Sequence, residues 1–136
     1  MHIRNSLNDF LQEIARSADH CLKPYKHSVL QDESIDLSTI CLEDFNEIIL
    51  KIETRDIHGV RYPENDLDLE IFRSGLELNI MLAWRSFPMK PILWQGKHAL
   101  WMDSNTGMRA NTPVEGDKIE SLARRLRSSF SSFLIE

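Results

Sequence analysis

The sequence predicts an α+β fold, in which a meander-like antiparallel sheet of about five strands carries an N-terminal and a C-terminal amphipathic helix packed on it. Apolar residues recur at helical spacing near each end of the chain, and runs of alternating polarity lie between them. No helical pattern separates these runs, and strands that follow one another without crossover helices pair antiparallel. The length of 136 residues suits one domain, so residues 1–136 are expected to form a single α+β unit.

The first helix is predicted over about residues 6–22. Ser6 and Asp9 offer a weak capping box at its start, and Pro24 ends it, because the residue before a proline is pushed out of the α region. Residues 25–44 give no assignable element, although a short alternating run at residues 34–38 is compatible with an edge strand. The apolar stripe of the helix consists of Leu7, Phe10, Leu11, Ile14, Ala18 and Leu22.

A strand is predicted at residues 46–55, where Ile48, Leu50 and Ile52 face one side of the sheet. The turn that follows is expected to centre on His58 and Gly59, which would place Asp56 opposite Arg61.

The next two strands, residues 67–74 and 76–85, form the clearest hairpin of the sequence. A turn centred on Ser74 and Gly75 pairs Leu69 with Ile80. In this register the apolar residues fall on one face and nearly all the polar residues on the other, so a slip of one residue would destroy the separation.

A last hairpin is expected from residues 92–94 and 97–103 around a turn at Gln95 and Gly96. This register places Trp94 opposite Lys97 and brings Trp101 to the same face. The other face carries Leu93, His98, Leu100 and Met102, so both faces are rather apolar.

The second helix has two candidate starts, at Thr112 and at Asp117, and Gly116 favours the later one. Its apolar stripe is the stronger of the two helical stripes and consists of Ile119, Leu122, Ala123, Leu126, Phe130 and Phe133.

Composition and charge exclude several classes of protein. The net charge of −5 argues against nonspecific binding to nucleic acid or to anionic membranes. The N-terminal residues have no apolar signal region, and the longest unbroken apolar run, residues 80–84, is far too short to span a membrane. We therefore expect a soluble, cytoplasmic protein with neither membrane nor nucleic acid as a partner, in which Cys21 and Cys41 are free thiols.

No short catalytic motif is present, and no histidine or cysteine pair has the spacing of a metal site. Asp66, Asp68 and Glu70 alternate along one predicted strand, where either a cation site or an ordinary solvated face accounts for them. The sequence thus predicts no catalytic residue, no metal and no cofactor.

Two functions remain open. The first is a noncatalytic interaction or assembly domain, as a homodimer or with another protein, whose surface includes Trp94, Lys97 and Trp101. It requires both helices to cover the opposite face of the sheet; otherwise the tryptophans belong to the core. The alternative is a small-molecule-binding protein or an enzyme with a pocket between sheet and helices, for which the candidate residues are Arg85, His98 and Asp103.

Overall fold

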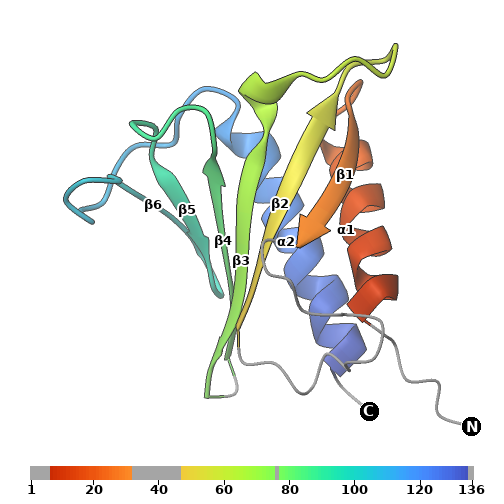
Figure 1. Ribbon diagram of the computed structural model, residues 1–136. Coiled ribbons are helices and arrows are strands. Elements are labelled where there is room, and N and C mark those ends of the chain that lie inside the picture. The colour runs from red at the N-terminus through yellow and green to blue at the C-terminus, as the bar shows by residue number, and fades with distance from the viewer. Residues whose placement is uncertain (1–6, 32–46, 76, 135–136) are drawn as a thin grey trace, which may run out of the picture.

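The computed structural model describes residues 7–31, 47–75 and 77–134 (Figure 1). Its six strands form one antiparallel sheet in which the strand order follows the chain order. The α+β class and the meander are confirmed, with one strand more than the predicted five. The elements are α1 (Leu7–Cys21), β1 (Lys26–Gln31), β2 (Glu47–Arg55), the short 3-10 helix η3 (Pro63–Asn65), β3 (Leu67–Ser74), β4 (Glu77–Trp84), β5 (Ile92–Gln95), β6 (Ala99–Met102) and α2 (Gly116–Leu134).

Both helices lie on the same side of the sheet (Figure 1). Helix α1 packs against β1, α2 packs against β4 and β5, and the two helices contact each other. One hydrophobic core fills the space between this helical layer and the sheet. Among the described elements, no helix covers the other side, which we call the open face of the sheet.

Both helical stripes contribute to this core, as predicted, through those of their members whose side chains the structure describes. Phe10, Ile14 and Ala18 of α1 have no exposed surface, and Leu122 and Leu126 of α2 have none either. The ring centroids of Phe10 and Phe130 lie 4.1 Å apart in an edge-to-face arrangement that joins the two helices. Helix α2 begins at Gly116, one residue before the later of its two candidate starts, so Asp117 lies in its first turn.

Strand β1 occupies part of the segment that the sequence left unassigned. It pairs with β2, and it places His27 and Val29 on the helical side of the sheet while Ser28 and Leu30 point the other way. Its alternation is hard to recognise because an edge strand with one paired neighbour buries little of its surface. The run at residues 34–38 and Cys41 lie outside the described residues.

The β3–β4 hairpin is confirmed, but its register differs from the predicted one by two residues. Leu69 pairs with Leu82 and Ser74 with Glu77, so the turn lies one position later than expected. Since side chains alternate with a period of two, this shift leaves every residue on its predicted face.

The predicted register of the β5–β6 hairpin is wrong. Gln95 pairs with Ala99, so a three-residue loop replaces the expected two-residue turn, and Trp94 pairs with Leu100 instead of Lys97. The odd shift moves Trp101 to the helical side of the sheet, where it is 4% exposed. There its ring stacks on Trp84 at a centroid distance of 6.0 Å, and its Nε1 donates a hydrogen bond of 2.6 Å to the Glu120 carboxylate.

The turn after β2 also differs from the prediction. The Asp56 N–H donates to the Val60 carbonyl, and Arg61 lies opposite Arg55 instead of Asp56. The Arg61 guanidinium binds both carboxylate oxygens of Asp66, at 3.0 and 2.7 Å.

The Asp66 carboxylate fixes the connection between β2 and β3. One of its oxygens also accepts a hydrogen bond of 2.7 Å from the Thr54 N–H. Burial raises the pKa of Asp66, but the hydrogen bonds and charge of Arg61, together with the Thr54 N–H, outweigh burial and hold the pKa below its usual range.

Candidate functional site

A row of side chains crosses the open face over five strands. Ile49 pairs with Glu70, Glu70 with Met81, Met81 with Trp94, and Trp94 with Leu100. Four of these five residues are apolar, and Ile49 and Trp94 keep 40% and 38% of their surface exposed. The open face is therefore apolar at its centre.

Neighbouring residues widen this row. Phe72, Ile92 and Met102 each lie two positions along a strand from a member of the row, so their side chains emerge on the same face. The Trp94 ring is held in place because its Nε1 donates a hydrogen bond of 3.1 Å to the Asn79 side chain. We call the combined surface the apolar patch; it consists of Ile49, Phe72, Met81, Ile92, Trp94, Leu100 and Met102.

Charged groups border both sides of the apolar patch. On the β2–β3 side, burial and the neighbouring carboxylate of Glu47 raise the pKa of Glu70, so two acidic groups lie close together there. On the β6 side, Lys97, His98, Arg109 and Glu77 line a shallow hollow together with Trp94 and Leu100. The Lys97 ammonium lies 3.5 Å from the Glu77 carboxylate, which leaves Arg109 as the second cation of the hollow.

The six sequence-predicted site residues are scattered over the molecule. Trp94 lies in the apolar patch and Lys97 lies exposed at its border, whereas Trp101 is a core residue, so these residues do not form one surface. Arg85, His98 and Asp103 line no common pocket among the described residues. Arg85 forms an ion pair of 3.8 Å with Asp68, and His98 is exposed in the β5–β6 loop.

Asp103 has a structural role in the turn after β6. Its carboxylate accepts hydrogen bonds from the N–H groups of Thr106 and Asn105, which lower its pKa. The carboxylates of the predicted row are also separated, because Asp66 is buried against Arg61 while Asp68 and Glu70 face the open side. No three histidine, cysteine or acidic side chains gather as a metal site in the described part of the chain.

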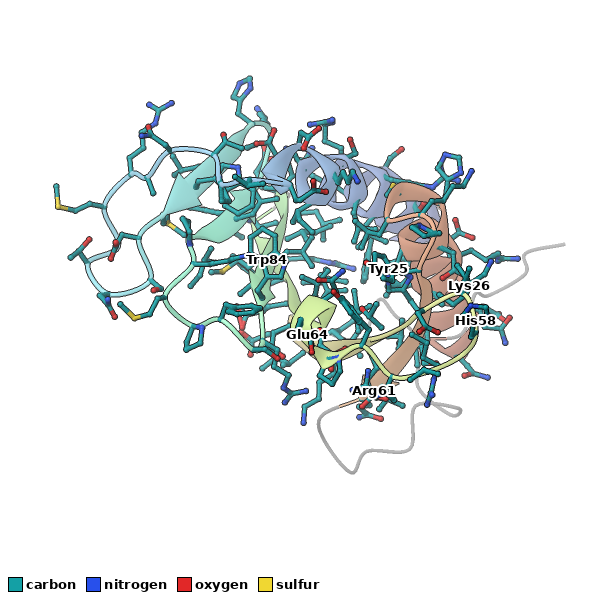
Figure 2. All side chains as sticks on the ribbon, turned by 90° about the horizontal axis from the view of Figure 1, so that it is seen from above. Tyr25, Lys26, His58, Arg61, Glu64 and Trp84 are labelled. Atoms are coloured by element: carbon teal, nitrogen blue, oxygen red, sulfur yellow. The ribbon has the colours of Figure 1, made fainter. Side chains whose placement is uncertain are left out.

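The residues of a second candidate site come from a different end of the molecule. A cavity of about 110 Å³ lies where the end of α1 and the start of α2 meet the sheet. Figure 2 looks onto this end and labels Tyr25, just before β1, and Trp84, at the end of β4. We call it the end cavity; its polar or aromatic lining includes Tyr25, His27, Asn65, Trp84, Lys90 and Lys118.

His27 is the most buried ionisable group of the end cavity. Its side chain is 1% exposed, and its Nδ1 lies 2.9 Å from the Asp19 carboxylate. Burial lowers the pKa of His27 by more than the hydrogen bond to Asp19 raises it, so the ring is neutral at neutral pH. The neutral ring carries its proton on Nδ1, because Asp19 is an acceptor, and Nε2 is then an acceptor.

This pKa shift predicts a pH-dependent stability. The unfolded chain has a histidine pKa near the ordinary value of about 6.5, and the folded chain has a lower one. Between these two values the unfolded state binds more protons, so the free energy of unfolding falls as the pH falls below about 6.5. Urea unfolding at a series of pH values should show this slope.

His27→Gln should reduce that slope, and His98→Gln, at an exposed loop position, should leave it as in the parent. If the free energy of unfolding fell equally steeply with pH in the parent and in His27→Gln, the pH dependence could not be assigned to His27.

The fold and these two surfaces define a two-layer α+β domain with one open sheet face. A family model described as "Domain of unknown function (DUF8659)" matches residues 11–129, and the chain belongs to this family. No curated protein matches the chain, and no solved structure does. None of the helices in the described ranges combines the length and the apolar character needed to cross a membrane.

The sequence alone indicates Trp94 as a surface residue but does not reveal the end cavity. His27 lies in β1, which the sequence did not reveal, and its neighbours in the cavity come from segments far apart in the chain. In the sequence, β1 is indicated only by a weak alternation, in which His27 and Val29 fall on one face. Lys26, Ser28 and Leu30 fall on the other.

Proposed function

We propose that the protein is a noncatalytic interaction domain that self-associates through the apolar patch. The observation that supports this function is the row from Ile49 to Leu100, which crosses five strands on the face that neither helix covers. Contiguous apolar surfaces of this kind are uncommon on monomers, and aromatic residues and methionine are enriched in interfaces.

The charges beside the apolar patch favour a second copy as the partner. A twofold axis parallel to the strands would turn the β2–β3 side of one copy over the β6 side of the other. Glu70 would then face Arg109 of the second copy, whereas an axis across the strands would set like charges against each other.

Such an axis would pass near Trp94. This residue lies on β5, between Glu70 on β3 and Arg109, which pairs with Met102 beyond β6. The two Trp94 rings would then lie at the centre of the interface, where substitutions have their largest effects.

We expect Trp94→Glu to remain folded and to convert a dimer into a monomer. The side chain is partly exposed, so the variant loses little core packing, but it places an unpaired charge at the centre of the interface. Analytical ultracentrifugation gives the mass, and circular dichroism reports the fold. Ile57→Glu, at an exposed position in the turn after β2, is the matched control and should keep the parent mass.

Charge reversal provides a second measurement. Glu70→Lys and Arg109→Glu should each weaken the dimer, and the double variant should recover part of the loss. A parent that sediments as a monomer at high concentration would refute self-association, and so would a folded Trp94→Glu variant of unchanged mass.

A further inference from the structure

We propose that two neighbouring loops at one end of the sheet dock on an anionic lipid bilayer. The first loop, residues 85–91, joins β4 to β5, and the second, residues 103–109, follows β6 (Figure 1). They expose Phe87, Met89 and Met108, and the two methionines keep 74% and 70% of their surface exposed. We call these three side chains the loop tip. None of them belongs to the apolar patch, so this inference goes beyond the proposed self-association.

The two loops are in contact with each other. The Ser104 hydroxyl donates a hydrogen bond of 2.7 Å to the Pro88 carbonyl. The Asn105 side-chain nitrogen lies 3.9 Å from the Met89 sulfur. The loop tip is therefore one apolar site, unlike single apolar residues scattered over a surface, which need no explanation.

The backbone of the two loops needs few hydrogen-bond partners from outside. Five of the seven N–H groups in the second loop donate within that loop, namely those of Asp103, Asn105, Thr106, Gly107 and Met108. In the first loop, Pro88 and Pro91 have no N–H group, and the Lys90 N–H donates to the Phe87 carbonyl. A protein partner can hydrogen-bond to a loop backbone, whereas the acyl region of a bilayer cannot. The internally bonded N–H groups therefore favour a bilayer as the occupant.

The charges of the two loops complement anionic lipids. Their ionisable residues are three cations and one acid, namely Arg85, Lys90, Arg109 and Asp103, so the loops carry a net charge of 3 − 1 = +2. The Asp103 carboxylate is engaged by the N–H groups of its own turn, and Arg85 is engaged by Asp68. The Lys90 ammonium lies 4.9 Å from the centroid of the Phe87 ring, next to the loop tip. The net charge of −5, which argues against nonspecific binding to anionic membranes, is a sum over the whole chain and does not describe this end.

The shape of the loop tip also suits a fluid surface. None of its three side chains lines the end cavity or the hollow beside Trp94. A protein interface requires close complementarity of shape, whereas lipid chains fill the space around projecting side chains. Apolar side chains at the acyl boundary, with a lysine at the level of the phosphates, are typical of proteins that bind a membrane surface.

Sedimentation with unilamellar vesicles tests the proposal on the full chain. One set of vesicles consists of phosphatidylcholine alone, and the other of equal amounts of phosphatidylcholine and phosphatidylserine. The parent should sediment with the mixed vesicles and several-fold less with the pure ones. Added salt should reduce this difference, because it screens the charges of the loops.

Variants locate the contact. Met89→Gln combined with Met108→Gln changes two exposed side chains outside the core, so the circular dichroism spectrum should stay as in the parent. This variant should bind the mixed vesicles about tenfold more weakly, because two apolar side chains no longer enter the bilayer. Leu30→Gln, which removes an exposed apolar side chain from β1, is the matched control and should bind as the parent does. Lys90→Gln should weaken binding to the mixed vesicles and leave the weaker binding to phosphatidylcholine unchanged.

Three results would overturn the proposal. A parent that sediments with neither kind of vesicle would leave the loop tip to a protein partner or to solvent. Equal binding by the parent and the methionine variant would show that the loop tip does not enter the bilayer. Loss of binding in folded Trp94→Glu, which leaves the loop tip intact, would assign the contact to the apolar patch. Binding retained in Trp94→Glu, whatever its mass, would support the loop tip independently of self-association.

Discussion

Leu126→Ala is expected to lower the free energy of unfolding by about 2–5 kcal/mol, the range for removing a buried leucine side chain and leaving a cavity. Leu126 has no exposed surface and lies on α2, which packs against β4, β5 and α1. The cavity would therefore open where the helical layer meets the sheet. The urea midpoint should fall, and the slope of the transition should stay as in the parent.

The matched control for Leu126→Ala is Arg124→Ala, two residues away on the exposed side of α2. Substitutions on a solvated helix surface change stability by about 0.5 kcal/mol or less. A midpoint for Leu126→Ala equal to that of Arg124→Ala would show that the apolar stripe of α2 does not carry the packing.

Arg61→Ala is expected to lower the free energy of unfolding by about 2–3 kcal/mol. This is somewhat less than the loss that follows when a fully buried ion pair loses one partner. The Asp66 side chain is 7% exposed and would lose both of its bonds to the guanidinium, while Arg61 itself is 32% exposed and already partly screened by water. Arg61 also donates to the Thr54 carbonyl, so the connection between β2 and β3 would loosen.

Adding Asp66→Asn to Arg61→Ala should recover part of this loss, because it removes the unpaired charge and keeps an oxygen for the Thr54 N–H. Arg55→Ala, at a nearby arginine that bonds the Gly59 carbonyl, is the control and should have a small effect. Thermal unfolding of the four proteins measures the differences. Equal stability of Arg61→Ala and Arg55→Ala would contradict the role of Arg61.

The sequence predicts the faces of a strand far better than the pairing between strands. The β3–β4 hairpin deviates by an even number of residues, so Leu69 and Ile80 are on the predicted face even though their partners differ. The β5–β6 hairpin deviates by an odd number, and Trp101 therefore lies in the core. Both faces of that hairpin are apolar, so polarity could not correct the choice of turn.

The candidate sites show the same limit. Trp94 could be predicted because a large aromatic residue on an apolar strand can be recognised from the sequence alone. His27 could not, because its importance depends on Asp19 beside it and on Lys90 and Lys118 across the cavity. Contacts between residues so far apart in the chain are set by the packing of the helices on the sheet, which no local pattern records.

The strand order has a consequence for folding. Within the described sheet, every strand pairs only with strands that adjoin it along the chain, so the β3–β4 and β5–β6 pairings close only short loops, although 15 residues separate β1 from β2. The contact between α1 and α2 is different, since the Phe10 and Phe130 rings that meet there are 120 positions apart in the chain. The natural order of events is therefore local pairing of the strands first and joining of the two helices last. On such a route, substitutions in the β3–β4 hairpin would slow folding, whereas those between the helices would mainly speed unfolding.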